Sequence, residues 1–155
     1  MGWSRRDPTV EGFKVITYVI DASVAVKWYS SFGEEDLSKA DKLLQMYVEG
    51  SCDFMAPTLI AYELANALRF NPNFDVKDVK RALKDFAELQ VRLQPPFEYL
   101  NSAIDLAFKY SLTLYDAVYA ALSQIAGAPL ITADYKFWSK VNKLSFIEAL
   151  RDLEI

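Results

Sequence analysis

Histidine is absent from this 155-residue sequence, and cysteine occurs once, as Cys52. The lack of histidine excludes the Ser-His-Asp and Cys-His schemes of nucleophilic catalysis, which need an imidazole as general base. With one cysteine the chain cannot form an internal disulfide or a zinc site built from Cys and His. Any catalysis must therefore use carboxylates, lysine, tyrosine or a bound metal ion, and the cysteine usage predicts a cytoplasmic protein.

Long apolar runs are also missing. The apolar stretches, such as residues 15–20, are far shorter than the roughly 18 residues that a membrane-spanning helix needs, so we expect no membrane segment. Hydrophobic residues make up 52% and charged residues 25% of the chain, which is typical of a domain with a packed core. The length favours one domain, which we place at residues 14–155, preceded by an N-terminal extension over residues 1–13.

Apolar runs and helical periodicities alternate along the chain. Residues 14–20, 52–55 and 129–132 are short apolar runs that predict buried strands. Apolar residues at helical intervals predict helices that begin near residues 38, 57, 75, 100, 115 and 137, while residues 144–153 fit either a strand or a helix. This alternation predicts an α/β fold, a three-layer α/β/α sandwich around a central, mostly parallel sheet.

Two of the predicted helices carry specific expectations. Pro57 suits a first helical turn because its backbone angle is fixed, and Ala67 is expected on the same inner face as Glu63. In the helix that begins near residue 100, Ile104 and Phe108 belong to the stripe expected to be buried.

Four carboxylates fall where this fold would bring them together. Asp21 and Asp134 follow predicted strands, and ligands of open α/β sheets bind at the carboxyl ends of strands. Asp116 lies in the first turn of its helix, where the helix dipole favours a carboxylate. Glu63 lies on an apolar helical face, which costs several kcal/mol unless the carboxylate is paired or binds a metal. For each aspartate, an ordinary turn or helix cap is the alternative.

Together the four carboxylates would repel one another, because no lysine or arginine lies in any of the four segments. A bound divalent cation would offset this repulsion. Oxygen donors without His or Cys favour Mg²⁺ or Mn²⁺ over zinc or copper. The sequence therefore predicts a divalent metal site formed by Asp21, Glu63, Asp116 and Asp134.

The same four segments resemble the motifs of PIN-domain proteins, specifically the VapC-type toxins. They are Val-Ile-Asp-Ala-Ser at residues 19–23, Tyr-Glu-Leu-Ala-Asn-Ala-Leu at 62–68 within residues 57–68, Leu-Tyr-Asp-Ala-Val-Tyr-Ala-Ala-Leu at 114–122, and Leu-Ile-Thr-Ala-Asp at 130–134. Each motif alone is weak, but their order, spacing and flanking residues together are specific. The resemblance spans about residues 14–142.

The resemblance implies a PIN fold in which the four acids bind Mg²⁺ or Mn²⁺ and the protein cleaves RNA phosphodiester bonds. Ser23, Asn66 and Thr132 match polar positions near the family's metal site, although ordinary turn and helix hydrogen bonds would explain them equally well. A cognate antitoxin would place its C-terminal segment in an apolar groove and block the site, and the toxin would form a homodimer. The N-terminal extension departs from the family pattern, whose members begin almost directly with the first strand.

The formal charge of −4 does not decide whether the chain binds RNA. Without the four proposed ligands the 21 acidic residues become 17, which equals the 17 basic residues, and each bound divalent ion adds positive charge at the site. Lys27, Arg69 and Lys136 are candidate phosphate contacts, with ordinary solvated charges as the alternative.

Two other functions fit parts of the pattern. A Mg²⁺-dependent phosphohydrolase also has an aspartate after a strand, but its usual Asp-x-Asp motif would need an acid where this chain has Ser23. A PIN fold that serves only as an RNA-binding or scaffold module typically lacks one or more acids, whereas all four are present here. The leading prediction is therefore a metal-dependent endoribonuclease, the toxin of a toxin-antitoxin pair.

Overall fold

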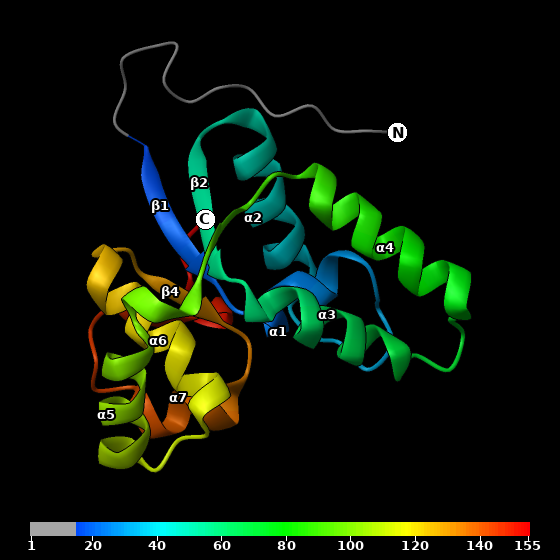
Figure 1. Ribbon diagram of the computed structural model, residues 1–155. Helices are drawn as coiled ribbons and strands as arrows, with labels where there is room; N and C mark the ends of the chain where they lie inside the picture. Colours follow the sequence, from blue (N-terminus) through cyan, green and yellow to red (C-terminus); the bar gives the residue numbers. More distant parts are fainter. Residues whose placement is uncertain (1–14) are drawn as a thin grey trace.

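A computed structural model describes residues 15–155 of the chain (Figure 1). At its centre lies a five-stranded sheet in the order β3-β2-β1-β4-β5, in which every neighbouring pair of strands is parallel. The strands are β1 (Ile16–Ile20), β2 (Cys52–Pro57), β3 (Arg92–Gln94), β4 (Leu130–Thr132) and β5 (Ile147–Ala149). The predicted extension over residues 1–13 lies outside the described residues and stays a prediction.

Helices cover both faces of the sheet, which confirms the three-layer α/β/α prediction. Figure 1 shows α2, α3 and α4 on one side of the sheet and α5, α6 and α7 on the other. The α-helices are α1 (Ala22–Ala25), α2 (Leu37–Glu49), α3 (Leu59–Arg69), α4 (Val76–Glu88), α5 (Leu100–Tyr110), α6 (Leu114–Ala126) and α7 (Tyr135–Val141), and short 3-10 helices span Val26–Trp28, Pro96–Glu98 and Leu150–Asp152. Within residues 15–155, no helix combines the length and apolar character needed to cross a membrane.

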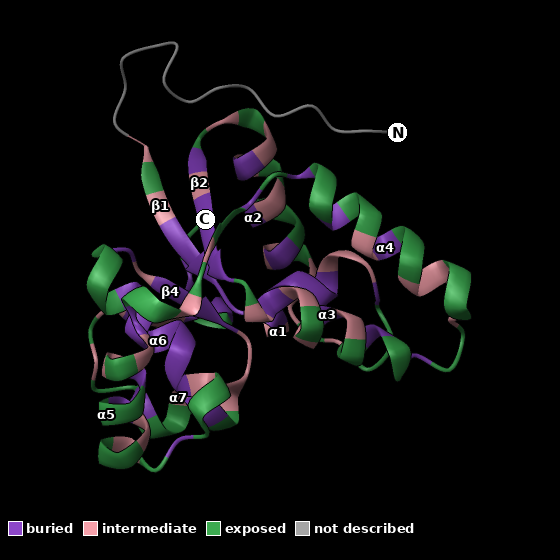
Figure 2. Ribbon diagram, viewed as in Figure 1, coloured by how far each residue is buried: buried purple, intermediate pink, exposed green. Residues whose placement is uncertain are grey.

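The core forms where the central strands meet α6. Residues 18–20 of β1 and 130–132 of β4 are buried, as are residues 117–123 of α6 (Figure 2). A helix that is buried on nearly every side needs small and apolar residues all round, which the alanine-rich sequence of α6 supplies. On the other side of the sheet the rings of Tyr47 and Phe54 stack with centroids 4.3 Å apart. The packing of α6 against α5 and the strands β1, β2 and β4 fixes its position, and with it that of Asp116.

The strand order reverses beside β1. From β1 the chain runs to β2 and β3 on one side and then crosses to β4 and β5 on the other. Such a reversal opens a crevice at the carboxyl ends of the two strands on either side of it. Here these strands are β1 and β4, which pair directly through Val19↔Leu130 and Ile20↔Ile131. Residues that follow β1 and β4 therefore lie at a common crevice.

Some predicted element boundaries were wrong. Pro57 is the last residue of β2, opposite Gln94 of β3, and does not lie in the first turn of a helix. The chain continues the pairing with Thr58, whose N–H donates to the carbonyl of Gln94 over 3.1 Å. The three-residue strand β3 was not predicted, and residues 144–153, which fitted either element, contain β5.

Three residues expected on inner helix faces are exposed instead: Ala67, Ile104 and Phe108. The largest departure is Phe108, which is 86% exposed. α5 packs along α6 and buries Ala103 and Leu106, so it is rotated relative to the stripe inferred from periodicity. Periodicity locates an apolar stripe on a helix, but it does not say whether that stripe packs into the core or lies exposed on the surface of the protein.

Candidate active site

A pocket of about 260 Å³ lies in the crevice beyond β1 and β4. All four predicted acids line it, and each comes from a different segment: Asp21 follows β1, Glu63 is on α3, Asp116 is on α6 and Asp134 precedes α7. The remaining described lining residues are Ala22, Ser23, Val26, Asn66 and Ala67. The fold thus gathers four carboxylates around one pocket whose described lining contains no lysine or arginine.

Asp21 is the most deeply buried of the four acids, with 7% of its surface exposed. Its backbone N–H donates to the carbonyl of Ile131 on β4, which fixes the residue at the strand end. Its Oδ2 accepts hydrogen bonds from the hydroxyls of Ser23 (2.8 Å) and Thr132 (2.7 Å). Burial raises the pKa of Asp21 to about 6, although these hydrogen bonds oppose the rise and nearby carboxylates add to it.

Glu63 is held by Tyr119, a residue of the 114–122 motif for which the sequence predicted no role of its own. The hydroxyl of Tyr119, a residue only 1% exposed, donates to Oε1 of Glu63 over 2.6 Å. Burial is the main cause that raises the pKa of Glu63 to about 7; the charges of the three aspartates add to the rise, and this hydrogen bond opposes it. One sequence signal was available, because Tyr119 follows Asp116 by three residues and so lies near it on the same helix surface.

Asp116 occupies the first turn of α6, as predicted. Its backbone N–H donates to the hydroxyl of Thr113, the N-cap residue, over 3.1 Å. Burial and then the charge of Asp134 raise the pKa of Asp116, while Thr113 and the ammonium of Lys140 lower it. Lys140, on α7, is a second residue of this region that the sequence analysis missed.

Asp134 begins α7 as its N-cap residue. Its Oδ1 accepts the backbone N–H of Phe137 (3.0 Å), and its own N–H donates to the hydroxyl of Thr132 (3.1 Å). The ordinary capping role weighed for this aspartate is therefore present. A cap uses one carboxylate oxygen, so the second oxygen remains available to a ligand.

Ser23 and Thr132 connect the two strand ends behind the pocket. Besides bonding Asp21, the Ser23 hydroxyl accepts the backbone N–H of Ala133 over 2.9 Å, and its oxygen lies 3.4 Å from that of Thr132. Ser23 lines the pocket, whereas Thr132 is buried behind it. Asn66 is exposed and lines the pocket on the same helix as Glu63.

The three basic residues proposed as phosphate contacts differ in exposure. Lys27 is buried, forms an ion pair with Glu34 over 2.6 Å and donates to the carbonyl of Glu35, so both the phosphate contact and the solvated charge considered for it were wrong. Arg69 and Lys136 are exposed. The burial of Lys27 depends on the loop before α2, which folds back over it.

The donor set fits a hard divalent cation in chemistry and in size. All four acids offer oxygen ligands, which Mg²⁺ and Mn²⁺ prefer. Mg²⁺ usually keeps several waters, each of about 30 Å³, and the pocket volume of about 260 Å³ has room for them. Within residues 15–155 no three Asp, Glu or Cys side chains already converge closely enough to hold a metal ion. Mutual repulsion favours such separation, so binding would require the side chains to rotate inward.

Comparison with known proteins places these features in a family. The sequence model of the PIN domain matches residues 18–144. Ribonuclease VapC3 of Pyrobaculum aerophilum is 29% identical over 131 residues, which cover 81% of this chain and 95% of that protein.

Two solved structures share the fold. A chain of a toxin-antitoxin complex from Klebsiella pneumoniae has a TM-score of 0.62 and 15% identity, covering 89% of this chain and 99% of that one. VapC20 of Mycobacterium tuberculosis, described as a Sarcin-Ricin loop cleaving toxin, has a TM-score of 0.61 and 15% identity, covering 79% of this chain and 93% of that one.

Proposed function

Because the chain belongs to the PIN-domain family, we propose that it is a metal-dependent endoribonuclease that hydrolyses RNA phosphodiester bonds. One observation carries the proposal: four carboxylates from four separate segments surround a single pocket at the carboxyl ends of β1 and β4. The relative with 29% identity is named as a ribonuclease, which supports the same activity.

The proposed cofactor is Mg²⁺ or Mn²⁺, held by Asp21, Glu63, Asp116 and Asp134. Such an ion, when bound, would supply positive charge for the phosphoryl oxygens and lower the pKa of the attacking water. The chain's own contribution is positioning, because Asp21 is oriented by two hydroxyls and Glu63 by Tyr119. A pocket carboxylate would accept a proton from the water as the water oxygen bonds to phosphorus; the bond from phosphorus to the leaving oxygen breaks, and the leaving oxygen takes up a proton from solvent.

The direct test is cleavage of two labelled RNAs, one structured and one unstructured, in Mg²⁺, Mn²⁺ or EDTA. We expect cleavage only with a divalent ion, and a loss of about 100-fold or more in Asp21→Asn and Asp116→Asn. The exposed Asp85 on α4 supplies a matched control, since Asp85→Asn removes the same charge outside the pocket lining. A contaminating nuclease would be equally active in all preparations.

The opposite result would identify the alternative function. If wild type and variants are equally inert while RNA or a protein partner still binds, the chain is a PIN-fold scaffold rather than a nuclease. Cleavage in EDTA would also contradict the proposed metal dependence.

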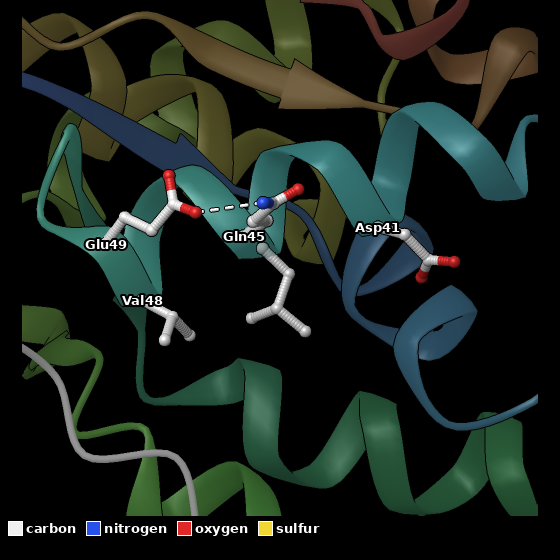
Figure 3. A pocket seen from close by; sticks show the side chains of 5 residues that line it. Asp41, Gln45, Val48 and Glu49 are labelled. Carbon is white, nitrogen blue, oxygen red and sulfur yellow. Dashed lines mark hydrogen bonds between the residues drawn. The ribbon is translucent and has the colours of Figure 1, made fainter.

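We further propose a small antitoxin as the protein partner. The Klebsiella pneumoniae neighbour was solved as a toxin-antitoxin complex, which supports this assignment. A hollow of about 290 Å³ along α2, with the apolar residues Leu44 and Val48 in its described lining, offers a surface for an apolar segment. Val48 points into it, and Asp41, Gln45 and Glu49 surround it, with Gln45 hydrogen-bonded to Glu49 over 2.9 Å (Figure 3). Acidic residues around apolar walls suit a partner segment whose apolar side chains are flanked by basic ones.

The antitoxin assignment can be tested by co-expression with the neighbouring reading frame. We expect its product to co-purify with the chain and inhibit cleavage, and Val48→Asp to weaken both effects. Failure to co-purify would remove the antitoxin while leaving the nuclease assignment untouched. The cytoplasmic location and the homodimer also remain proposals.

A further inference from the structure

The helix α7 has three faces: one packs into the core, one lies under Arg151, and one is left uncovered by these contacts. Phe137 and Val141 are buried in the core. Tyr135 and Trp138 lie beneath the guanidinium of Arg151, which is 4.2 Å from the centroid of the first ring and 5.4 Å from that of the second. The remaining surface of this short helix forms a separate strip.

That strip carries Lys136 and Lys140, which are both exposed. Residues four apart on a helix are neighbours, with Cβ atoms about 5–6 Å apart. Within residues 15–155 neither lysine forms an ion pair, and the Nζ of Lys140 donates to the carbonyl of Ser111 over 3.2 Å. An ammonium group has three N–H donors, so the single bond to Ser111 still leaves Lys140, like Lys136, able to bind an anionic ligand.

The strip borders the acid pocket. Asp134, which lines the pocket, is the N-cap of the helix that carries both lysines. Ser111, the partner of Lys140, ends α5 two residues before Thr113, whose hydroxyl caps the turn that holds Asp116. The charge of Lys140 also lowers the pKa of Asp116.

RNA needs positive charge at this place. Each nucleotide carries a negative phosphate, and four carboxylates around the pocket repel it. A divalent ion offsets the charge at the scissile phosphate, but the phosphates on either side need cations outside the pocket. Lys27 does not supply one because it is buried against Glu34, whereas the lysines of α7 are exposed at the pocket's border.

We propose that Lys136 and Lys140 form an RNA-docking strip that binds phosphates next to the scissile one. The inference rests on the proposed ribonuclease function and adds to it the side of the pocket along which the RNA strand runs. Ammonium groups bind the phosphate backbone without reading the bases. The strip therefore contributes affinity for RNA of any sequence and leaves target choice to other contacts.

The test is the salt dependence of RNA binding to the full chain in EDTA, measured by fluorescence anisotropy with a labelled single-stranded RNA. Each lysine–phosphate contact contributes about 0.7 to the slope of log K against log salt. We expect Lys136→Gln/Lys140→Gln to reduce the magnitude of that slope by about 1.4 and to weaken binding at each salt concentration. Lys136→Arg/Lys140→Arg should retain the wild-type slope, since it retains both charges.

A control double variant separates the effect of losing this strip from the effect of losing two positive charges anywhere on the protein. Lys80→Gln/Lys84→Gln removes two exposed lysines with the same spacing from α4, and we expect its slope to match that of wild type. An equal fall in both double variants, an unchanged slope in the α7 variant, or no RNA binding by wild type would overturn the proposal. Because EDTA prevents metal-dependent cleavage, this binding experiment is independent of the nuclease assay. If the protein cleaves no RNA but shows the change in slope, the nuclease proposal fails and the RNA-docking strip stands.

Discussion

Two carboxyl groups in the pocket have pKa values near neutral pH because the fold buries them. The pKa of Asp21 is raised to about 6 and that of Glu63 to about 7. An acid whose pKa rises on folding binds its proton more tightly in the folded state. Its contribution to the free energy of unfolding is fully present below the pKa of the unfolded chain, near 4, and is lost as the pH rises through the pKa of the folded state. For Asp21 this amounts to something on the order of 3 kcal/mol.

We therefore expect the unfolding free energy in EDTA to fall between about pH 4 and pH 7. Thermal melts of wild type, Asp21→Asn and Glu63→Gln across this range would measure the effect, and each variant should flatten part of the fall. Mg²⁺ or Mn²⁺ should restore stability at pH 8 in wild type, because the ionised carboxylates bind the cation. Parallel pH profiles for wild type and both variants would show that the two carboxyls do not titrate in this window.

Tyr119 offers a sharper test of how Glu63 is prepared for a cation. Its hydroxyl donates to the Glu63 carboxylate and stabilises the charged form, so Tyr119→Phe should raise the pKa of Glu63 further. We expect Mn²⁺ affinity, measured by calorimetry, to fall several-fold at pH 6.5 and to recover in part at pH 8. Tyr47→Phe is the matched control, since the Tyr47 hydroxyl donates to the carbonyl of Leu89, which is not among the described lining residues of the pocket. Equal losses in the two variants would indicate a packing effect.

Residue by residue, sequence reasoning located the acids better than their surroundings. The positions of Asp21 and Asp134 after apolar runs were enough to predict a shared pocket, because strand ends meet in this architecture. Their roles as metal ligands remain predictions. The partners Tyr119 and Lys140 depend on how α6 and α7 are rotated, and the burial of Lys27 depends on a loop. Apart from the three-residue interval that places Tyr119 near Asp116 on one helix, a local pattern contains none of this information.

At the scale of elements, the first turn of α6 connects stability to the pocket. Thr113 accepts the N–H of Asp116, and loss of an N-cap hydroxyl costs about 1 kcal/mol. Thr113→Ala should therefore lower the unfolding free energy in urea by about that amount and reduce cleavage, because the turn that holds Asp116 loosens. Thr113→Ser keeps the oxygen and should recover both properties. Full activity in Thr113→Ala would show that the cap is not needed to position Asp116.

Elements with strong local signals were predicted well, and those defined by pairing were not. α2 and α6 end before Gly50 and Gly127, and both glycines adopt the positive φ angles that make glycine a strong signal for the end of a helix. β3 has three residues and exists because it pairs with β2, so nothing in its own sequence marks it. Pro57 could be assigned to a strand only once its position at the end of β2 was known.

For the whole molecule, alternating strands and helices were sufficient to predict the layers but not the order of the strands. The reversal beside β1 makes β4 its neighbour, and this arrangement brings together acids that are far apart in the chain. Right-handed crossovers narrow the possible topologies without selecting one. The meeting of the four acids was therefore predicted from the general rule that the carboxyl ends of strands form the binding crevice of an open α/β sheet.

The outer face of α5 makes a prediction about assembly. Ile104 and Phe108 lie four residues apart and are 41% and 86% exposed, and Phe97 just before the helix is 89% exposed. Such an apolar stripe is costly in water and is typical of a surface that binds another protein. A two-fold axis across this face would bury the stripe of each copy against the other.

We therefore expect the wild-type chain to be dimeric by size-exclusion chromatography with light scattering, and Phe108→Glu to be monomeric at the same concentration. Two opposed glutamates near a two-fold axis would repel each other and would also remove the apolar contact. Phe32→Glu is the control, because Phe32 is 57% exposed in the loop before α2 and should leave the dimer intact. A monomeric wild type, or a Phe108→Glu variant that stays dimeric, would show that α5 does not form the interface. If the monomeric variant still cleaves RNA, each copy carries a complete site, as expected when all four acids come from one chain.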